Sequence, residues 1–104
     1  MDVKLLPVIH QLVMNGNKAA LVTIIATKGS TPRKIGSQML VTPDGRVVGT
    51  IGGGCAEAEA KKRALSAMDE GKVSVCTITM YNSVAGDEGM ACGGVMELFI
   101  QLVR

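Results

Sequence analysis

The chain has 104 residues, a length that suits one domain and leaves little room for a second. Eleven basic and nine acidic residues give a net charge of +2, and Tyr81 and Phe99 are its only aromatic residues. This mixed charge lacks the clustered basic face of a nucleic-acid binder, and too few aromatics are present for base stacking. Charges and glycines interrupt every apolar run before the ~18 residues of a membrane span, so the composition argues against both nucleic-acid and membrane roles.

The cysteine count and the first residues bear on the compartment. Three cysteines are odd in number and too few for a disulfide framework in a chain of this length. The first thirteen residues lack the basic region and small-residue cleavage site of a secretory signal. These features predict a cytoplasmic protein with reduced thiols. The four-ligand spacing of a structural zinc site is also missing.

Hydrophobic periodicity and turn residues predict the secondary structure along the chain. The predicted elements are, in chain order, helix 5–13, strands 19–27, 38–42 and 46–51, helix 55–70, and strands 73–80 and 95–103. The continuous apolar run of strand 19–27 is typical of a strand covered on both faces. Pro43-Asp44-Gly45 favours a tight turn and therefore a β-hairpin. Residues 81–94 form a loop long enough to suggest a function.

This order of elements predicts an α/β fold in a single domain spanning residues 1–104. We expect a mixed β-sheet of about five strands that contains the hairpin, with helices packed against it. The hairpin requires an antiparallel pair, and the helix between two strands permits a crossover. An alanine-rich stripe predicts the buried face of helix 55–70. Spacing of four residues predicts two ion pairs on that helix, Glu57 with Lys61 and Glu59 with Arg63.

Gly52, Gly53 and Gly54 stand directly before the second predicted helix, followed by Cys55. Free amides and the positive end of a helix dipole would attract a phosphate or another anion there. A thiol at that end is more easily ionised, and thiolate is the form that attacks sulfur or binds a metal. The alternative, equally supported, is a tight turn followed by a small buried cysteine. The string matches neither a P-loop nor the dinucleotide-binding fingerprint.

Cys92 repeats this pattern, because Gly93 and Gly94 follow it just before the last predicted strand. The recurrence of glycines beside a cysteine at the end of an element favours a shared role with Cys55. Cys76 differs, since it alternates with apolar residues in the middle of a strand and is predicted to be core.

Two further candidates are weaker. Arg33 and Lys34 lie beside small hydroxyl residues in the loop GSTPRK and could bind phosphate, although an exposed turn is almost as well supported. His10 falls on the first helix, far in sequence from the cysteine loops, and is predicted to be a surface residue rather than a ligand.

Taken together, these strings resemble the XdhC/CoxI family of molybdenum-hydroxylase accessory proteins. The matching residues are Gly29 to Arg33, Gly36, Met39 to Val41, Asp44, Gly45, Gly49, Gly52 to Cys55, Glu57, Gly89, Cys92 to Gly94 and Glu97. The resemblance runs from about Ala20 to the C-terminus and corresponds to the N-terminal domain, since many members continue into a second, Rossmann-like domain.

The resemblance implies an accessory protein that binds molybdenum cofactor of the molybdopterin type as cargo and assists its sulfuration or insertion. It places cofactor contacts on Cys55 and Cys92 with their glycines, and more weakly on Glu57 and Arg33. Its implied partners are the apo-form of a xanthine dehydrogenase-like hydroxylase, a cysteine desulfurase or a separate Rossmann-domain chain, and a second copy in a homodimer.

Three functional hypotheses remain open on the sequence. The first is a cofactor-binding chaperone without enzymatic activity. The second is a sulfur-transfer protein that carries a persulfide on one cysteine. The third is a regulatory or structural subunit of a larger complex that binds no ligand.

Overall fold

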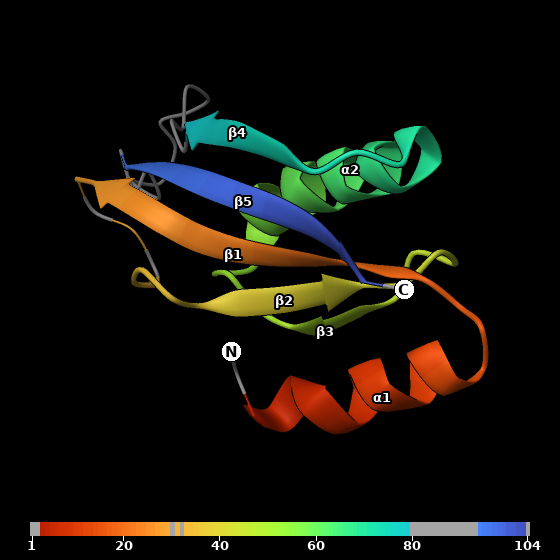
Figure 1. The fold of residues 1–104 in the computed structure, drawn as a ribbon. Helices are drawn as coiled ribbons and strands as arrows, with labels where there is room; N and C mark the ends of the chain where they lie inside the picture. Colours follow the sequence, from red (N-terminus) through yellow and green to blue (C-terminus); the bar gives the residue numbers. More distant parts are fainter. Residues whose placement is uncertain (1–2, 30, 32, 80–93, 104) are drawn as a thin grey trace.

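The computed structural model describes residues 3–29, 31, 33–79 and 94–103, which fold around one sheet (Figure 1). A 3-10 turn, Val3–Leu5, leads into helix α1, and a second helix, α2, separates the third and fourth strands. The elements are α1 (Leu6–Met14), β1 (Ala19–Lys28), β2 (Gln38–Val41), β3 (Val47–Gly49), α2 (Gly54–Glu70), β4 (Ser74–Thr79) and β5 (Val95–Val103). Every predicted helix and strand is therefore present, and the shifts of their ends are small.

The sheet has five strands in the order β3-β2-β1-β5-β4. Five strands, a hairpin and packed helices confirm the predicted architecture. The expected mixture of parallel and antiparallel pairs is wrong, because all four pairings are antiparallel. The reason lies in the crossover: α2 joins β3 to β4, which run in the same direction but lie at opposite edges of the sheet. Three strands separate them, so the crossover creates no parallel pair.

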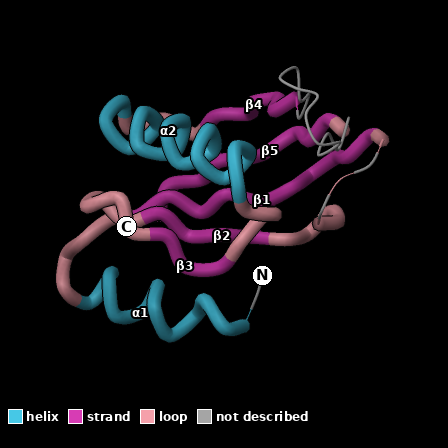
Figure 2. Tube along the Cα trace, turned by 180° about the vertical axis from the view of Figure 1, so that it is seen from behind, coloured by secondary structure: helices cyan, strands magenta, loops and turns pink. Residues whose placement is uncertain are grey.

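Two helices cover the two faces unequally (Figure 2). The larger core lies between the sheet and α2, where the predicted alanine stripe is buried and Met96, Leu98 and Ile100 of β5 are fully enclosed. The smaller core lies under α1, against the first residues of β1 and the β2–β3 hairpin. Since α1 reaches only this end of its face, strand β1 is covered on both sides only in its first half.

The register between strand β1 and strand β5 shifts within β1. Ile24 pairs with Leu98, and the next paired residue, Ala26, faces Glu97, so Ile25 is an extra residue in a β-bulge. Ile25 is 41% exposed despite its apolar side chain. The part of β1 that is enclosed on both faces therefore ends at the bulge. The pattern of apolar residues in the sequence does not predict this shift of register.

The β2–β3 hairpin is held by its turn. The amide of Gly45 donates to the carbonyl of Thr42, and the amide of Thr42 donates to the carbonyl of Arg46, both at 2.9 Å. The Thr42 hydroxyl donates to the Asp44 carboxylate, which also accepts the amide of Arg46. These contacts confirm the predicted turn and hold the pKa of Asp44 below its ordinary value, chiefly through the Thr42 hydroxyl.

Replacing Asp44 by Asn should remove one pH-dependent part of the stability. Because its folded pKa is lowered, the Asp44 carboxylate stabilises the fold above the unfolded pKa, and this contribution is lost as pH falls through the folded pKa. We expect the wild type to lose more stability than Asp44→Asn when urea unfolding is repeated from neutral pH to below about 3. Equal losses in the two proteins would contradict the assignment.

Candidate functional site

The first predicted glycine–cysteine string forms the turn between β3 and α2. Gly52, Gly53 and Gly54 all have positive φ angles, of 132°, 75° and 60°. Gly53 combines its φ of 75° with a ψ of −173°, a conformation that is essentially restricted to glycine. The side chain of Ile51 is fully buried in the core under α2 and anchors the turn. The glycines thus serve the backbone path directly.

A carboxylate on the following helix occupies the inside of this turn. Oε2 of Glu57 accepts hydrogen bonds from the Thr50 hydroxyl at 2.6 Å and from the amides of Gly53 and Ile51 at 3.1 and 3.3 Å. The amide of Gly52 donates to the Thr50 hydroxyl at 2.9 Å. The expectation that the turn's own amides point outward to an anion is therefore wrong at residues 51–53, because the chain supplies its own anion.

This arrangement also corrects a predicted ion pair. Glu57 turns back toward the helix start, whereas Glu59 makes the expected bond with Arg63, at 3.0 Å. A carboxylate that reaches back to the N-cap amide resembles a capping box, shifted by one residue along the helix. Sequence reasoning missed Thr50 altogether. The usable signal was a hydroxyl residue before the glycines and a glutamate within the first helical turns.

Cys55 lies in the first turn of α2 and its side chain is exposed. The N-cap, Gly53, has no side chain that could accept the first amides of the helix, although its own amide donates to Glu57. A Cβ atom at Gly53 or Gly54 would meet no atom of the described residues within 4 Å, so that part of the chain leaves space open beside the start of α2. The interpretation of Cys55 as a small buried residue is wrong. The site combines an accessible thiol, bare backbone and the positive end of a helix.

Cys76 has the opposite character and is only 7% exposed in the core beneath α2, as predicted. Burial raises the pKa of its thiol, which therefore stays protonated at neutral pH. Cys55 and Cys76 are both free cysteines, and of these two described thiols only that of Cys55 is accessible to solvent. Cys76 thus offers a natural control for experiments on Cys55.

The second glycine–cysteine string falls largely outside the described residues. Cys92 and Gly93 belong to the segment 80–93, whereas Gly94 is buried just before β5. Thr79, which ends β4, pairs with Val95, which begins β5. Helix α2 runs antiparallel to β4, so its N-terminus points toward this same end of the sheet (Figures 1 and 2). The described residues on either side of the segment that carries Cys92 thus lie at the end of the sheet toward which the N-terminus of α2 points.

The remaining sequence candidates lie on elements other than the turn. Arg33 and Lys34 are exposed in the loop that joins β1 to β2, and His10 is exposed on α1. Within residues 3–29, 31, 33–79 and 94–103, no group of three His, Cys, Asp or Glu side chains is placed to hold a metal ion. None of the described helices is both long and apolar enough to cross a membrane.

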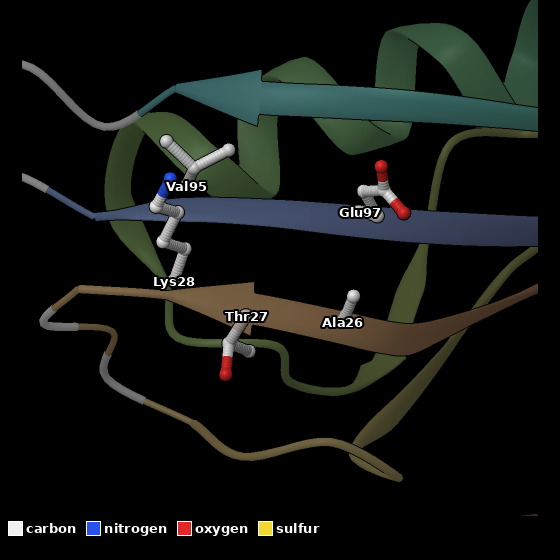
Figure 3. Close-up of a pocket in the computed structure, with 5 residues that line it drawn as sticks. All are labelled: Ala26, Thr27, Lys28, Val95 and Glu97. Atoms are coloured by element: carbon white, nitrogen blue, oxygen red, sulfur yellow. The ribbon is translucent and has the colours of Figure 1, made fainter.

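A depression of about 290 Å³ lies at the ends of β1 and β5 (Figure 3). It is lined by Ala26, Thr27, Lys28, Val95 and Glu97. In Figure 3 α2 passes behind the sheet, while Lys28, Val95 and Glu97 point toward the viewer. The depression is therefore on the opposite face from Cys55 and does not form part of the same site.

Comparison with known proteins gives a consistent result. The sequence profile of the XdhC and CoxI family matches residues 12–79. The chain is 42% identical over 62 residues to the molybdenum cofactor insertion chaperone PaoD of Escherichia coli, an alignment that covers 60% of this chain and 20% of PaoD. It is 41% identical over 83 residues to the uncharacterized protein YqeB of the same organism, covering 80% of this chain and 15% of YqeB.

More distant similarities extend over most of the chain. A probable xanthine dehydrogenase subunit of Bacillus subtilis is 30% identical over 97 residues, which cover 88% of this chain and 28% of that protein. A crystal structure described as a xanthine dehydrogenase from Bacillus halodurans superposes with a TM-score of 0.77 at 25% identity, covering 94% of this chain and 30% of the other. The chain thus spans 15–28% of the length of these curated relatives.

Proposed function

Because the chain belongs to the XdhC and CoxI family, we propose that it binds molybdenum cofactor of the molybdopterin type as cargo and assists its insertion into a molybdenum hydroxylase. The recipient would be the apo-form of a xanthine dehydrogenase-like enzyme. The chain would act in the cytoplasm, as a cofactor-binding chaperone rather than as the catalyst.

The observation that carries the proposal is the exposed Cys55 thiol at the uncapped start of α2. Soft sulfur ligands suit the sulfur-rich chemistry of the cargo, and the uncapped helix end favours its phosphate. Gly53 and Gly54 leave open space in which a ligand could approach the backbone closely. Glu57 would hold this turn in place rather than contact the cargo, since its carboxylate already accepts the turn's amides.

Cys92 is the second proposed contact, with Gly93 and Gly94 beside it. The support for Cys92 is the position of the described residues on either side of its segment. Thr79 and Val95 lie at the end of the sheet toward which the N-terminus of α2 points. Arg33 remains a weaker proposal for the phosphate, since it lies on the exposed loop between β1 and β2. A role in sulfuration of the cofactor would use the same thiols.

The test is retention of the cofactor by the purified protein. We expect wild-type protein to co-elute with molybdenum cofactor, and Cys55→Ala or Cys92→Ala to lower its affinity about tenfold or more. Cys76→Ala is the matched control, because it removes a buried thiol from the core and should leave retention unchanged. Absence of retention in wild type, or full retention in the Cys55→Ala/Cys92→Ala double variant, would contradict the proposal.

A second candidate function is sulfur transfer. The observation that favours it is the accessible, free thiol of Cys55. The thiolate of Cys55 would attack the outer sulfur of a persulfide on a cysteine desulfurase. A sulfur–sulfur bond would form at Cys55 while the one on the desulfurase breaks, and the desulfurase cysteine would leave as a thiolate. Mass spectrometry after incubation with a desulfurase and cysteine should then show one added sulfur atom in wild type and Cys76→Ala, and none in Cys55→Ala.

A further inference from the structure

The depression at the ends of β1 and β5 lies on a part of the sheet that neither described helix covers (Figure 3). Helix α2 packs on the opposite face, and α1 contacts only the first residues of β1. The volume of about 290 Å³ is at the lower end of the range for small-molecule sites, which begins at about 300 Å³. The described part of the chain therefore leaves room here for a small ligand.

The β-bulge at Ile25 decides which side chains of β1 reach this depression. Ile24 is buried in the core under α2. In a regular strand Ala26 and Lys28 would point to that same face, because side chains alternate with a period of two. The extra residue instead places both on the face that carries α1, where Ala26 pairs with Glu97. Bulges often re-aim side chains in this way beside functional sites.

Two opposite charges lie at the two ends of the depression without neutralising each other. Lys28 pairs with Val95 at the ends of the strands, and Glu97 pairs with Ala26 further in. Two residues of strand separate these positions, a rise of roughly 7 Å. No ion pair joins Lys28 to Glu97, and neither side chain has a hydrogen bond or an ion pair with another described residue. Both charges are thus available to a ligand.

The lining between these charges is apolar. Ala26 presents only a methyl group beside Glu97, and Val95 adds a second apolar side chain. A ligand that matches this lining carries an anion for Lys28, a cation for Glu97 and a short apolar group. A free α-amino acid combines these three parts in one small molecule, whereas either end of a peptide supplies only one of the two charges.

We propose that the depression binds a free α-amino acid with a short apolar side chain. The Lys28 ammonium group donates hydrogen bonds to the carboxylate of the ligand, and the Glu97 carboxylate accepts hydrogen bonds from the α-ammonium group. The side chain of the ligand covers Ala26 and Val95. This site is separate from the proposed cofactor site, because it lies on the face opposite Cys55.

Titration of the full chain with L-valine, followed through its amide resonances by nuclear magnetic resonance, tests the proposal. We expect saturable shifts at the residues that line the depression. Lys28→Gln and Glu97→Gln should each weaken binding about fivefold, the upper end of what an exposed ion pair contributes. Lys18→Gln and Glu70→Gln are the matched controls. They remove the same charges at exposed positions outside the depression and should leave the affinity unchanged.

A third variant and two analogues of L-valine test the shape and the charges of the site. Ala26→Leu fills the depression and keeps both charges, so it should abolish the shifts. L-valine amide keeps only the ammonium group, as a peptide N-terminus would, and N-acetyl-L-valine keeps only the carboxylate, as a peptide C-terminus would. Both analogues should bind more weakly than L-valine.

Three outcomes overturn the proposal. The first is the absence of saturable shifts when L-valine is added to wild type. The second is unchanged affinity in either Lys28→Gln or Glu97→Gln. The third is binding of one analogue as tight as that of L-valine, which would assign the depression to the end of a peptide chain.

Discussion

Gly49→Ala should destabilise the protein by about 3 kcal/mol, from a positive-φ conformation and a backbone clash acting together. Gly49 has a φ of +87°, and a Cβ atom there would lie 2.8 Å from the carbonyl oxygen of Gln38 in the paired strand. The obstacle is backbone, so it cannot rotate away as a side chain could. Gly49 also leads directly into the turn before Cys55, so a shift here would move the candidate site.

Gly36→Ala is the control for this prediction. Gly36 has a similar φ of +98°, but a Cβ atom there would meet none of the described atoms within 4 Å. This variant should cost only the backbone conformation, about 1–2 kcal/mol. Urea unfolding of the two variants and the wild type measures both contributions, and equal losses in the two variants would show that the approach to Gln38 is unimportant.

Glu57→Ala should destabilise the protein by about 2 kcal/mol, because charged hydrogen-bond acceptors contribute more than neutral ones. The substitution leaves the amides of Ile51 and Gly53 and the hydroxyl of Thr50 without their acceptor. Unlike a surface ion pair, this carboxylate fixes the backbone path that precedes Cys55. Loss of the bond should therefore loosen the turn as well as lower the unfolding free energy.

Glu57→Gln and Glu59→Gln separate these effects. Glu57→Gln keeps an oxygen acceptor in the turn, so it should recover part of the stability. Glu59→Gln removes a carboxylate from the same helix that bonds only exposed side chains, and it should change stability by less than about 1 kcal/mol. Urea unfolding and amide exchange at residues 51–55 report on both points. An unchanged exchange rate in Glu57→Ala would mean that the carboxylate does not hold the turn.

The roles of Gly53 and Glu57 bear on how the family motif is interpreted. A glycine run before a helix commonly suggests that a ligand anion sits on free amides. Here an internal carboxylate takes that position, and the ligand-facing features that remain are the Cys55 thiol and the uncapped first helical turn. A glutamate two residues after such a cysteine can thus hold the backbone of the site without contacting the ligand. Retention of the cofactor by Glu57→Gln would support this role, and loss of retention in a variant with an intact turn would indicate direct contact.

Local patterns along the chain were sufficient to predict its elements, because the hydrophobic period and turn chemistry act between near neighbours. The buried stripe of α2, the alternation of β5 and the turn at Asp44 all followed from such patterns. Cys76 was predicted to be core for the same reason, since its strand neighbours alternate.

Only the tertiary structure decided how these elements combine. All strand pairs of the sheet are antiparallel because the crossover through α2 places β4 at the edge opposite β3. The bulge at Ile25 depends on the register between β1 and β5. Glu57 had two possible partners, Lys61 on the helix surface and the amides of the turn, and the folded path of the backbone selected the amides. Strand partners and hydrogen-bond acceptors depend on which groups folding brings close together in space. The spacing of residues along the sequence does not by itself predict these contacts.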